Sequence, residues 1–363
     1  MPRLQLVTDC EGPLALNDYA FELCRDFLQP QGDRFFQQVR RYDDYLADVV
    51  KKPDYQAGNA LKLILPFLKA AGLTNARIRD YSVQTMQLMP GAEGAYHFLH
   101  GRKLPLFEIS TSYRQFAEAV GLKLGFDPGH IVCTELDLDR YRLAPGEAKE
   151  LARLKQEIVA APAIELPAEA ASLADLPGPA QETIGRFDRI FSEEIPALNI
   201  GAIYREVQTI GGFEKARALS DSLTETGYSL AEVMYVGDSI TDVQAFEAVQ
   251  AGGGLAVSFN GNVHAIAAAE VVVVASTAWP IALLAAIFEL WGKEGVLEVA
   301  APETRAKSRA LVLPEEVIEP IAMGLEGGVF NLYQSKAPNR EQIVRESASM
   351  RAQLRGGAVA DLS

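Results

Sequence analysis

Two pairs of acidic side chains follow short apolar segments of the chain. Asp9 and Glu11 come directly after an apolar segment near the N-terminus, and Asp238 and Asp242 come after Val233–Val236. A carboxylate such as Asp9 can attack phosphorus and form an aspartyl phosphate, and Glu11 could protonate the leaving oxygen and later activate water. Carboxylates four residues apart share a helical face, and hard oxygen ligands of this kind suit Mg²⁺. Each pair taken alone is also compatible with an ordinary turn or helix cap.

A lysine and a run of hydroxyl side chains could complete a phosphoryl-transfer site. Lys215 stands at the start of the helix expected over 214–226, where a cation beside a carboxylate and a phosphate offsets their repulsion. In the run Ser110-Thr111-Ser112, a hydroxyl and a backbone N–H can bind a phosphate oxygen. Taken singly, the lysine is also compatible with a solvated surface position, and the hydroxyls with a helix N-cap.

Strand-like and helix-like segments alternate around these residues. We expect strands at 4–8, 104–109, 131–138, 233–236, 255–259 and 271–275. Helices are expected among them at 93–99, 113–120, 214–226 and 243–251. This alternation predicts an α/β fold with a parallel sheet flanked by helices. Because ligands bind at the carboxyl ends of such strands, the acidic pairs, the hydroxyls and the lysine can meet in space despite their separation in the sequence.

The order of these motifs along the chain resembles that of the four motifs of the haloacid dehalogenase superfamily. The resemblance covers 1–13, 86–143 and 200–275, and Met89-Pro90-Gly91 precedes the second motif as in many members. The stretch LFEISTSYRQFAEAVGLKLGF looks like the corresponding stretch of phosphoserine phosphatases. The segment Asp-x-Glu-Gly-Pro is similar to that of an archaeal and bacterial group, some of whose members are labelled subunit R of an energy-converting hydrogenase. The resemblance implies a Rossmann-like core.

The resemblance implies catalytic roles for three residues. Asp9 would be the nucleophile, Glu11 the general acid and base, and Lys215 the cation that steadies the phosphoryl group. Most phosphatases of the superfamily have Asp at the position of Glu11 and Thr at the position of Pro13. Some members, such as enolase-phosphatases, have Glu followed by Gly, as this chain does.

The resemblance also implies Mg²⁺ as the cofactor. Its ligands would be the Asp9 carboxylate, the Glu11 backbone carbonyl and Asp238, with Asp242 as a further ligand or as the neighbour of one. Asn260 follows a strand at the place where phosphoserine phosphatases often have an Asn in the substrate pocket. The residues expected to bind the phosphoryl group or the substrate are Ser110, Thr111 and Asn260.

A chain of 363 residues is about twice the usual length of a single domain, so we expect a core with additions. The expected parts are a catalytic core at 1–13, 86–143 and 200–292, a helical cap at 14–85, a helical insertion at 144–199 and a C-terminal extension at 293–363. In this superfamily the cap selects the substrate, and its closure excludes water. Basic cap residues could contact a substrate or lie on a solvated helix face; they are Arg40, Arg41, Lys51 and Lys52.

Composition restricts the partners and the compartment. The formal net charge of −14 argues against nonspecific binding to nucleic acid or to an anionic membrane. Three scattered cysteines are too few for a disulfide framework or a zinc cluster, and the first ten residues lack the apolar region of a signal peptide, so we expect a cytoplasmic protein. The nearly uncharged segment Val271–Trp291 is about long enough to span a bilayer. We interpret it instead as a buried strand and a helix that begins at Pro280.

The sequence therefore predicts a Mg²⁺-dependent phosphatase that hydrolyses a small phosphorylated metabolite through an aspartyl phosphate. A phosphotransferase would use the same chemistry and differ only in its acceptor. A non-catalytic or regulatory subunit that keeps the fold and the metal site is the alternative outside enzymes. A homo-oligomer is compatible with all three.

Overall fold

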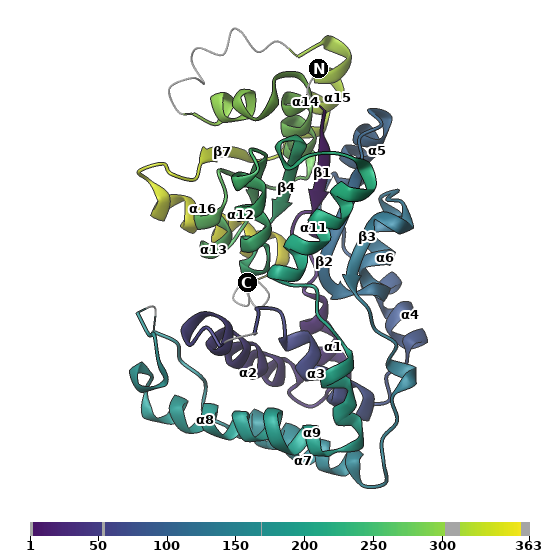
Figure 1. Ribbon diagram of the computed structural model, residues 1–363, viewed down its shortest axis with the longest axis vertical. Coiled ribbons are helices and arrows are strands. Elements are labelled where there is room, and N and C mark those ends of the chain that lie inside the picture. Colours follow the sequence, from purple (N-terminus) through teal and green to yellow (C-terminus); the bar gives the residue numbers. More distant parts are fainter. Residues whose placement is uncertain (1–2, 53–54, 168, 302–312, 357–363) are drawn as a thin grey trace.

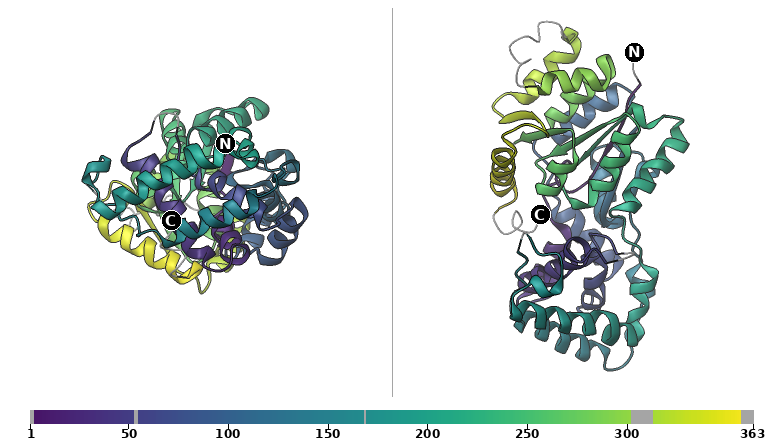
Figure 2. Two further views of the ribbon diagram at one scale, coloured as in Figure 1. Left: turned by 90° about the horizontal axis from the view of Figure 1, so that it is seen from below. Right: turned by 60° about the vertical axis from the view of Figure 1, so that its left-hand side comes forward.

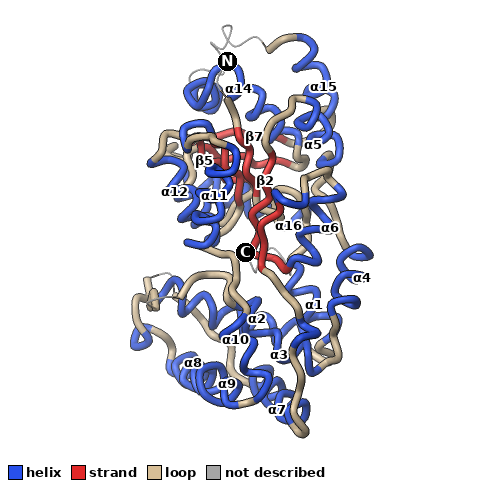
Figure 3. The backbone as a smooth tube through the Cα atoms, turned by 45° about the vertical axis from the view of Figure 1, so that its right-hand side comes forward, coloured by secondary structure: helices blue, strands red, loops and turns tan. Residues whose placement is uncertain are grey.

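The computed structural model describes residues 3–52, 55–167, 169–301 and 313–356. In Figure 1 its upper part is an α/β lobe built on one sheet, and its lower part is a lobe made of helices. Figure 3 shows the same division, with every strand in the upper lobe. The two lobes meet at the end of the sheet toward which β1 points (Figure 1).

Seven described strands form one sheet in the order β3-β2-β1-β4-β5-β6-β7. Six of them run parallel, and β7 at the edge pairs antiparallel with β6. Their bounds are β1 Gln5–Thr8, β2 Leu106–Tyr113, β3 Ile131–Thr134, β4 Val233–Gly237, β5 Leu255–Phe259, β6 Val271–Ala275 and β7 Phe330–Gln334. The mostly parallel sheet flanked by helices confirms the predicted α/β class.

Apolar side chains on both faces of the central strands place helices on both sides of the sheet. Val7 and Tyr235 pack with α11 and α12 on one face. Leu6 and Met234, one position along each strand, face the opposite side and join the larger core cluster with α5 and α14. The helices of this lobe are α5 Ala92–Gly101, α6 Arg114–Lys123, α11 Phe213–Thr226, α12 Val243–Ala251, α13 Val263–Ala268, α14 Trp279–Ala300, α15 Glu315–Leu325 and α16 Arg340–Arg355.

The helical lobe combines two segments that are distant in the sequence. Its helices are α1 Tyr19–Phe27, α2 Gly32–Asp44, α3 Ala60–Ala70, α7 Glu147–Ala160, α8 Gly178–Arg189, α9 Ile195–Ala197 and α10 Ile203–Glu206. The helix α7 packs against α2 and α3, and the Tyr42 hydroxyl donates to Asp188 Oδ1 at 2.6 Å, which ties α2 to α8. By contrast, α4 (Asn75–Thr85) packs against α6 of the α/β lobe. The helices α1 to α3 and α7 to α10 thus build one helical body.

Several element bounds differ from those expected from the sequence. The strand β2 continues to Tyr113 instead of ending at 109, with a shift of register against β3 after Ser110. The strand β3 ends at Thr134 because Leu138 belongs to a 3₁₀ turn. The strand β7 was not expected, since only Leu332 of its five residues is buried and the segment lacks an apolar pattern.

The nearly uncharged segment after β6 forms the helix α14, which packs on the sheet. This helix contains a kink at Gly292, whose φ of 68° departs from helical geometry. In the part of the chain that the structure describes, no helix has the length and apolar character needed to cross a membrane. At the C-terminal end, α16 runs along the side of the sheet toward the junction of the lobes, as the right-hand view of Figure 2 shows.

Candidate active site

The site lies at the carboxyl ends of three adjacent strands, where the two lobes meet. Thr8 in β1 pairs with Glu108 in β2 and with Val236 in β4, so the motifs that follow these residues leave the sheet at one level. A cavity of about 70 Å³ lies there. The α/β lobe lines it with Asp9, Glu11, Ser110, Thr111, Ser112 and Asp238. The helical lobe adds Asp18, Phe36, Arg40 and Gly58.

Lys215 is fully buried between two carboxylates. It lies in the first turn of α11, and its Nζ is 2.6 Å from Asp9 Oδ2 and 2.8 Å from Asp242 Oδ1. Burial acts to lower the pKa of Lys215, but the two carboxylates outweigh it and hold the pKa above its ordinary value. The lysine therefore stays charged and joins Asp9, which follows β1, to Asp242, which follows β4.

Asp242 is surrounded by hydrogen-bond donors. Its Oδ1 accepts from Lys215 and, at 3.1 Å, from the Tyr235 hydroxyl. Its Oδ2 accepts from the backbone N–H groups of Asp238 and Ser239, each at 3.1 Å. These contacts use both oxygens of Asp242 to hold the turn that carries Asp238. The geometry therefore favours Asp242 as the neighbour of a metal ligand over a direct ligand.

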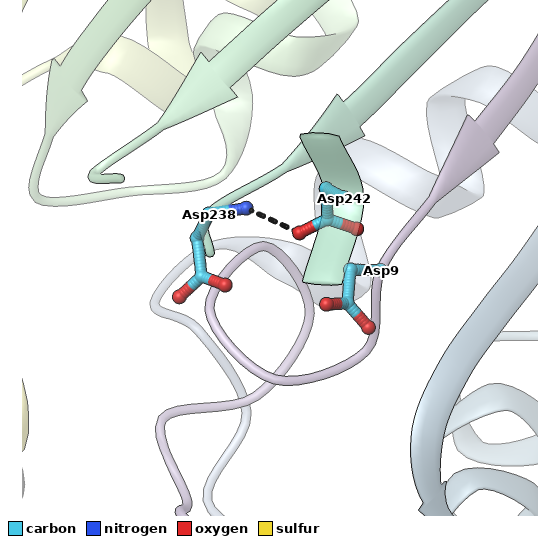
Figure 4. A group of neighbouring side chains, drawn as sticks. All are labelled: Asp9, Asp238 and Asp242. Carbon is cyan, nitrogen blue, oxygen red and sulfur yellow. Dashed lines mark hydrogen bonds between the residues drawn. The ribbon is translucent and has the colours of Figure 1, made fainter. Parts of the chain in front are cut away.

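Asp9, Asp238 and Asp242 form an acidic cluster in which one oxygen of each lies within 4.8 Å of the others. In Figure 4 the Asp9 and Asp238 side chains extend in the same direction from the ends of β1 and β4, whereas the Asp242 carboxylate turns back to the Asp238 backbone. Asp9 Oδ1 also accepts from the Cys10 N–H at 2.7 Å. Among the described residues, no side chain donates a hydrogen bond to the Asp238 carboxylate, whose nearest cation is Arg355.

Gly12 brings the turn that follows β1 against Asp238. Its φ is 107°, a region that residues with a Cβ rarely adopt. A Cβ at this position would lie 2.4 Å from Asp238 Oδ2. The backbone next to Glu11 therefore lies directly beside the Asp238 carboxylate.

Burial raises the pKa values of Asp9 and Asp238. The pKa of Asp9 rises to about 7, chiefly through burial, with Lys215 opposing the rise and Asp242 and Asp238 adding to it. The pKa of Asp238 rises to about 6, again through burial, and Arg355 opposes the rise. Crowded, desolvated carboxylates of this kind are stabilised in their charged forms by a divalent cation.

Glu11 points into the same cavity and has two donors. The Ser112 hydroxyl donates to Glu11 Oε1, and the Tyr19 backbone N–H lies 3.3 Å from the same oxygen. Burial, aided by the nearby Asp18 carboxylate, raises the pKa of Glu11 to about 8. A carboxyl group with such a pKa carries a proton at neutral pH and can donate it.

The hydroxyl run lies in the irregular end of β2. Tyr113, and none of the three hydroxyl residues, is the N-cap of α6. Ser110 Oγ accepts from the Ser112 N–H at 3.1 Å, while the buried Thr111 Oγ1 has no hydrogen-bond partner among the described residues. A Cβ on Gly58 would lie 2.8 Å from the Thr111 side chain, so the helical lobe touches this run. The hydroxyls are thus placed to contact a bound group.

Asn260 does not line the cavity, and unlike Lys215 and Asp242 its side chain makes no hydrogen bond to a residue that does. Its side-chain NH₂ donates to the Ala275 carbonyl at 2.8 Å, and its Oδ1 accepts from the Ala275 N–H at 2.9 Å. Both ends of the amide are therefore used to join β5 to β6. The resemblance to phosphoserine phosphatases implied that Asn260 binds the substrate. In the structure both side-chain hydrogen bonds go to the backbone of Ala275.

Ser112 and Arg355 line the cavity and were not assigned to the site from the sequence. Ser112, the partner of Glu11, belongs to a run in which only the first two hydroxyls were assigned. Arg355, at the end of α16, places Nη2 3.6 Å from Asp238 Oδ2. Its spacing from Arg351 puts both arginines on one helical face, which is a weak signal in a polar tail.

No protein-family model matches the chain, and no curated protein matches it. Among solved structures, gene product AF1437 from Archaeoglobus fulgidus is similar to it, with a TM-score of 0.78 and 30% sequence identity. The similarity covers 99% of this chain and 98% of that one, so it includes both lobes and the C-terminal helix. The chain belongs to the same family as this archaeal protein.

Proposed function

We propose that the protein is a Mg²⁺-dependent phosphatase that acts on a small phosphorylated metabolite, with Asp9 as the nucleophile. The observation that carries the proposal is the position of Lys215, which is buried in contact with Asp9 and Asp242 while Asp238 completes the acidic cluster. A buried lysine between two carboxylates at the ends of parallel strands suits a site that gathers negative charge from a phosphoryl group.

The donor set fits a magnesium ion. Mg²⁺ prefers carboxylate and carbonyl oxygens and is bound by few protein carboxylates, with the remaining positions open to water and substrate oxygens. Asp9 and Asp238 supply such oxygens, and the Glu11 backbone lies beside them. When bound, Mg²⁺ would supply positive charge to the phosphoryl oxygens and to the nucleophile.

In the first step Asp9 acts as the nucleophile. A carboxylate oxygen of Asp9 forms a bond to phosphorus, and the bond from phosphorus to the ester oxygen breaks. Glu11 donates its proton to that leaving oxygen, which departs as an alcohol. Lys215 holds the Asp9 carboxylate in place through Oδ2, and the hydroxyl run at the end of β2 can donate to the phosphoryl oxygens.

In the second step water completes the reaction. Glu11, now ionised, takes a proton from water as its oxygen attacks the phosphorus of the aspartyl phosphate. The bond between Asp9 and phosphorus breaks, phosphate is released, and Glu11 again carries a proton. The helical lobe, which contacts the cavity through residues such as Gly58 and Phe36, limits the water that reaches the acyl phosphate.

The test is a panel of small phosphoesters with Mg²⁺, in which the wild type is compared with Asp9→Asn. We expect turnover by the wild type and none above background by the variant. Asp221→Asn, an exposed carboxylate on α11, is the matched control and should keep full activity. If no phosphoester is turned over above the Asp9→Asn background, the catalytic proposal fails and a non-catalytic role for the same fold is favoured.

A further inference from the structure

The helix α16 places a buried arginine, Arg351, near the active site. Arg351 is 7% exposed, and its Nε and Nη1 have no hydrogen-bond partner among the described residues. A buried guanidinium without acceptors destabilises a folded protein. Because no described residue accepts from these two nitrogens, they are available to an acceptor on a bound molecule.

A large cavity adjoins this arginine. It has a volume of about 630 Å³ and lies between α16, the helical lobe and the start of α13. Arg351 and Ile240 line it from the α/β lobe. Its basic residues from the helical lobe are Arg40, Arg41 and Lys51.

The acidic residues of this cavity already have partners. Asp44 lies 3.1 Å from Arg40 and 3.7 Å from Arg41, and Asp48 lies 3.6 Å from His264. Arg351 takes part in none of these pairs. In a chain with a net charge of −14, a concave surface that gathers cations in this way attracts an anion.

The large cavity adjoins the cavity of the active site. Arg40 lines both cavities, and the consecutive residues Ser239 and Ile240 line the small and the large one. On α16, Arg355 lines the small cavity, whereas Arg351, one helical turn earlier, lines the large one. One extended small molecule can therefore reach Asp9 at one end and Arg351 at the other.

We infer that the large cavity is a subsite for a second anionic group of the substrate, with Arg351 as its principal ligand. The substrate class is then a small phosphoester that carries another phosphate or a carboxylate at its far end. This inference rests on the proposed function for the position of the first phosphate. The planar guanidinium, with donors that match both anions, suits either group.

The test compares Arg351→Gln with the wild type on three probes of equal chain length. The probes are 1,4-butanediol bisphosphate, 4-(phosphonooxy)butanoate and 4-hydroxybutyl phosphate, which has no second anionic group. We expect kcat/KM of the wild type to favour a probe with two anionic groups over 4-hydroxybutyl phosphate. In Arg351→Gln this preference should fall at least about tenfold, mainly through KM, because a charge-assisted contact is lost. The probe with the higher kcat/KM of the two that carry a second anionic group identifies that group as phosphate or carboxylate.

Two further variants separate a binding role from a structural one. Arg345→Gln removes an exposed arginine of the same helix, paired at 3.8 Å with Glu341, and should leave the preference unchanged. Arg351→Lys keeps the charge but loses the planar fork, and should restore only part of the preference. The melting temperature of free Arg351→Gln should stay equal or rise, whereas a structural arginine would give a clear fall.

Equilibrium binding separates this inference from the proposed function. Calorimetric titration of 1,4-butanediol bisphosphate into Asp9→Asn, with and without Arg351→Gln, needs no turnover. We expect the second substitution to weaken binding at least about tenfold. If activity depends on Asp9 but neither the preference nor the binding depends on Arg351, the subsite is refuted and the phosphatase stands. If no probe is turned over but binding depends on Arg351, the subsite stands without the phosphatase.

Discussion

Lys215 Nζ lies 2.8 Å from Asp242 Oδ1, and neither side chain is exposed to solvent. The same nitrogen lies 2.6 Å from Asp9 Oδ2. A single buried cation therefore lies between the carboxylate that follows β1 and one that follows β4, and links these two parts of the site.

Lys215→Met should destabilise the metal-free protein by about 3–5 kcal/mol, because it leaves buried carboxylates without their cation. Urea unfolding in the presence of a chelator measures this loss. The matched control is Lys293→Met, which removes a partly exposed lysine 2.7 Å from Glu270 and should cost no more than about 1 kcal/mol. Equal losses in the two variants would show that Lys215 has no special role in holding the site.

Asp238→Asn and Asp242→Asn should affect different properties. Asp238→Asn should lower the affinity for Mg²⁺ more than about tenfold, at little cost in stability, because the Asp238 carboxylate has few protein contacts. Asp242→Asn should lower the free energy of unfolding by about 3 kcal/mol, because both oxygens of Asp242 accept hydrogen bonds. Calorimetric titration of Mg²⁺ and urea unfolding provide the two readouts. The reverse order of effects would mean that Asp242 is the direct ligand.

Gly12→Ala should disturb the Asp238 carboxylate. The new Cβ would stand 2.4 Å from Asp238 Oδ2 at a φ of 107°, so we expect a loss of about 1–3 kcal/mol and weaker Mg²⁺ binding. Gly101→Ala is the control, since a Cβ there meets no atom within 4 Å and φ is not positive. A Gly12→Ala protein with wild-type stability and Mg²⁺ affinity would contradict the close packing of this turn.

Glu108, buried in β2, should make the free energy of unfolding depend on pH. Burial, aided by the charge of Asp9, raises the pKa of Glu108 to about 8 from an ordinary value of 4.5. The folded state thus retains a proton that the unfolded chain has lost, and this contribution to stability is full below pH 4.5 and is lost as the pH rises to about 8. Glu108→Gln should remove that loss, which amounts to at most about 1.4 kcal/mol per pH unit.

Urea unfolding of the wild type and Glu108→Gln from pH 5 to pH 9, without metal, measures the difference. We expect the two curves of unfolding free energy against pH to diverge up to about pH 8 and then to run parallel. The amide occupies nearly the same space as the carboxyl, which packs against α6 near Gly121. Curves that stay parallel throughout would show that Glu108 has an ordinary pKa.

The sequence was sufficient to predict six of the seven described strands and the polar residues at the ends of the central ones. The strands β1, β4, β5 and β6 are mostly apolar, as burial on both faces requires, and were predicted within a residue of their bounds. Lys215 and Asp238 were assigned to the site because the order of the motifs resembles that of a known superfamily, and their places at a helix start and a strand end allow them to meet in a parallel sheet. Local pattern and topology agree in this part of the chain.

Contacts between distant segments could not be predicted in this way. The strand β7 is a partly exposed edge, and Arg351 and Arg355 read as surface residues of a polar helix until the packing of α16 buries them. Asn260 shows the opposite case, in which a residue in a suggestive position hydrogen-bonds to Ala275. In each case the side chain's partners come from long-range packing, on which the local sequence carries no information.

The proposed function requires that Asp9 accept a phosphoryl group beside a Mg²⁺ ion. A crystal structure of the protein with Mg²⁺ and beryllium fluoride tests it without knowledge of the substrate, because beryllofluoride on a carboxylate mimics an acyl phosphate. We expect beryllofluoride on Asp9, with Mg²⁺ bound by the carboxylates of Asp9 and Asp238 and with Lys215 still in contact with Asp9. A structure in which Asp9 carries no beryllofluoride, or in which no metal lies between Asp9 and Asp238, would contradict this role of Asp9.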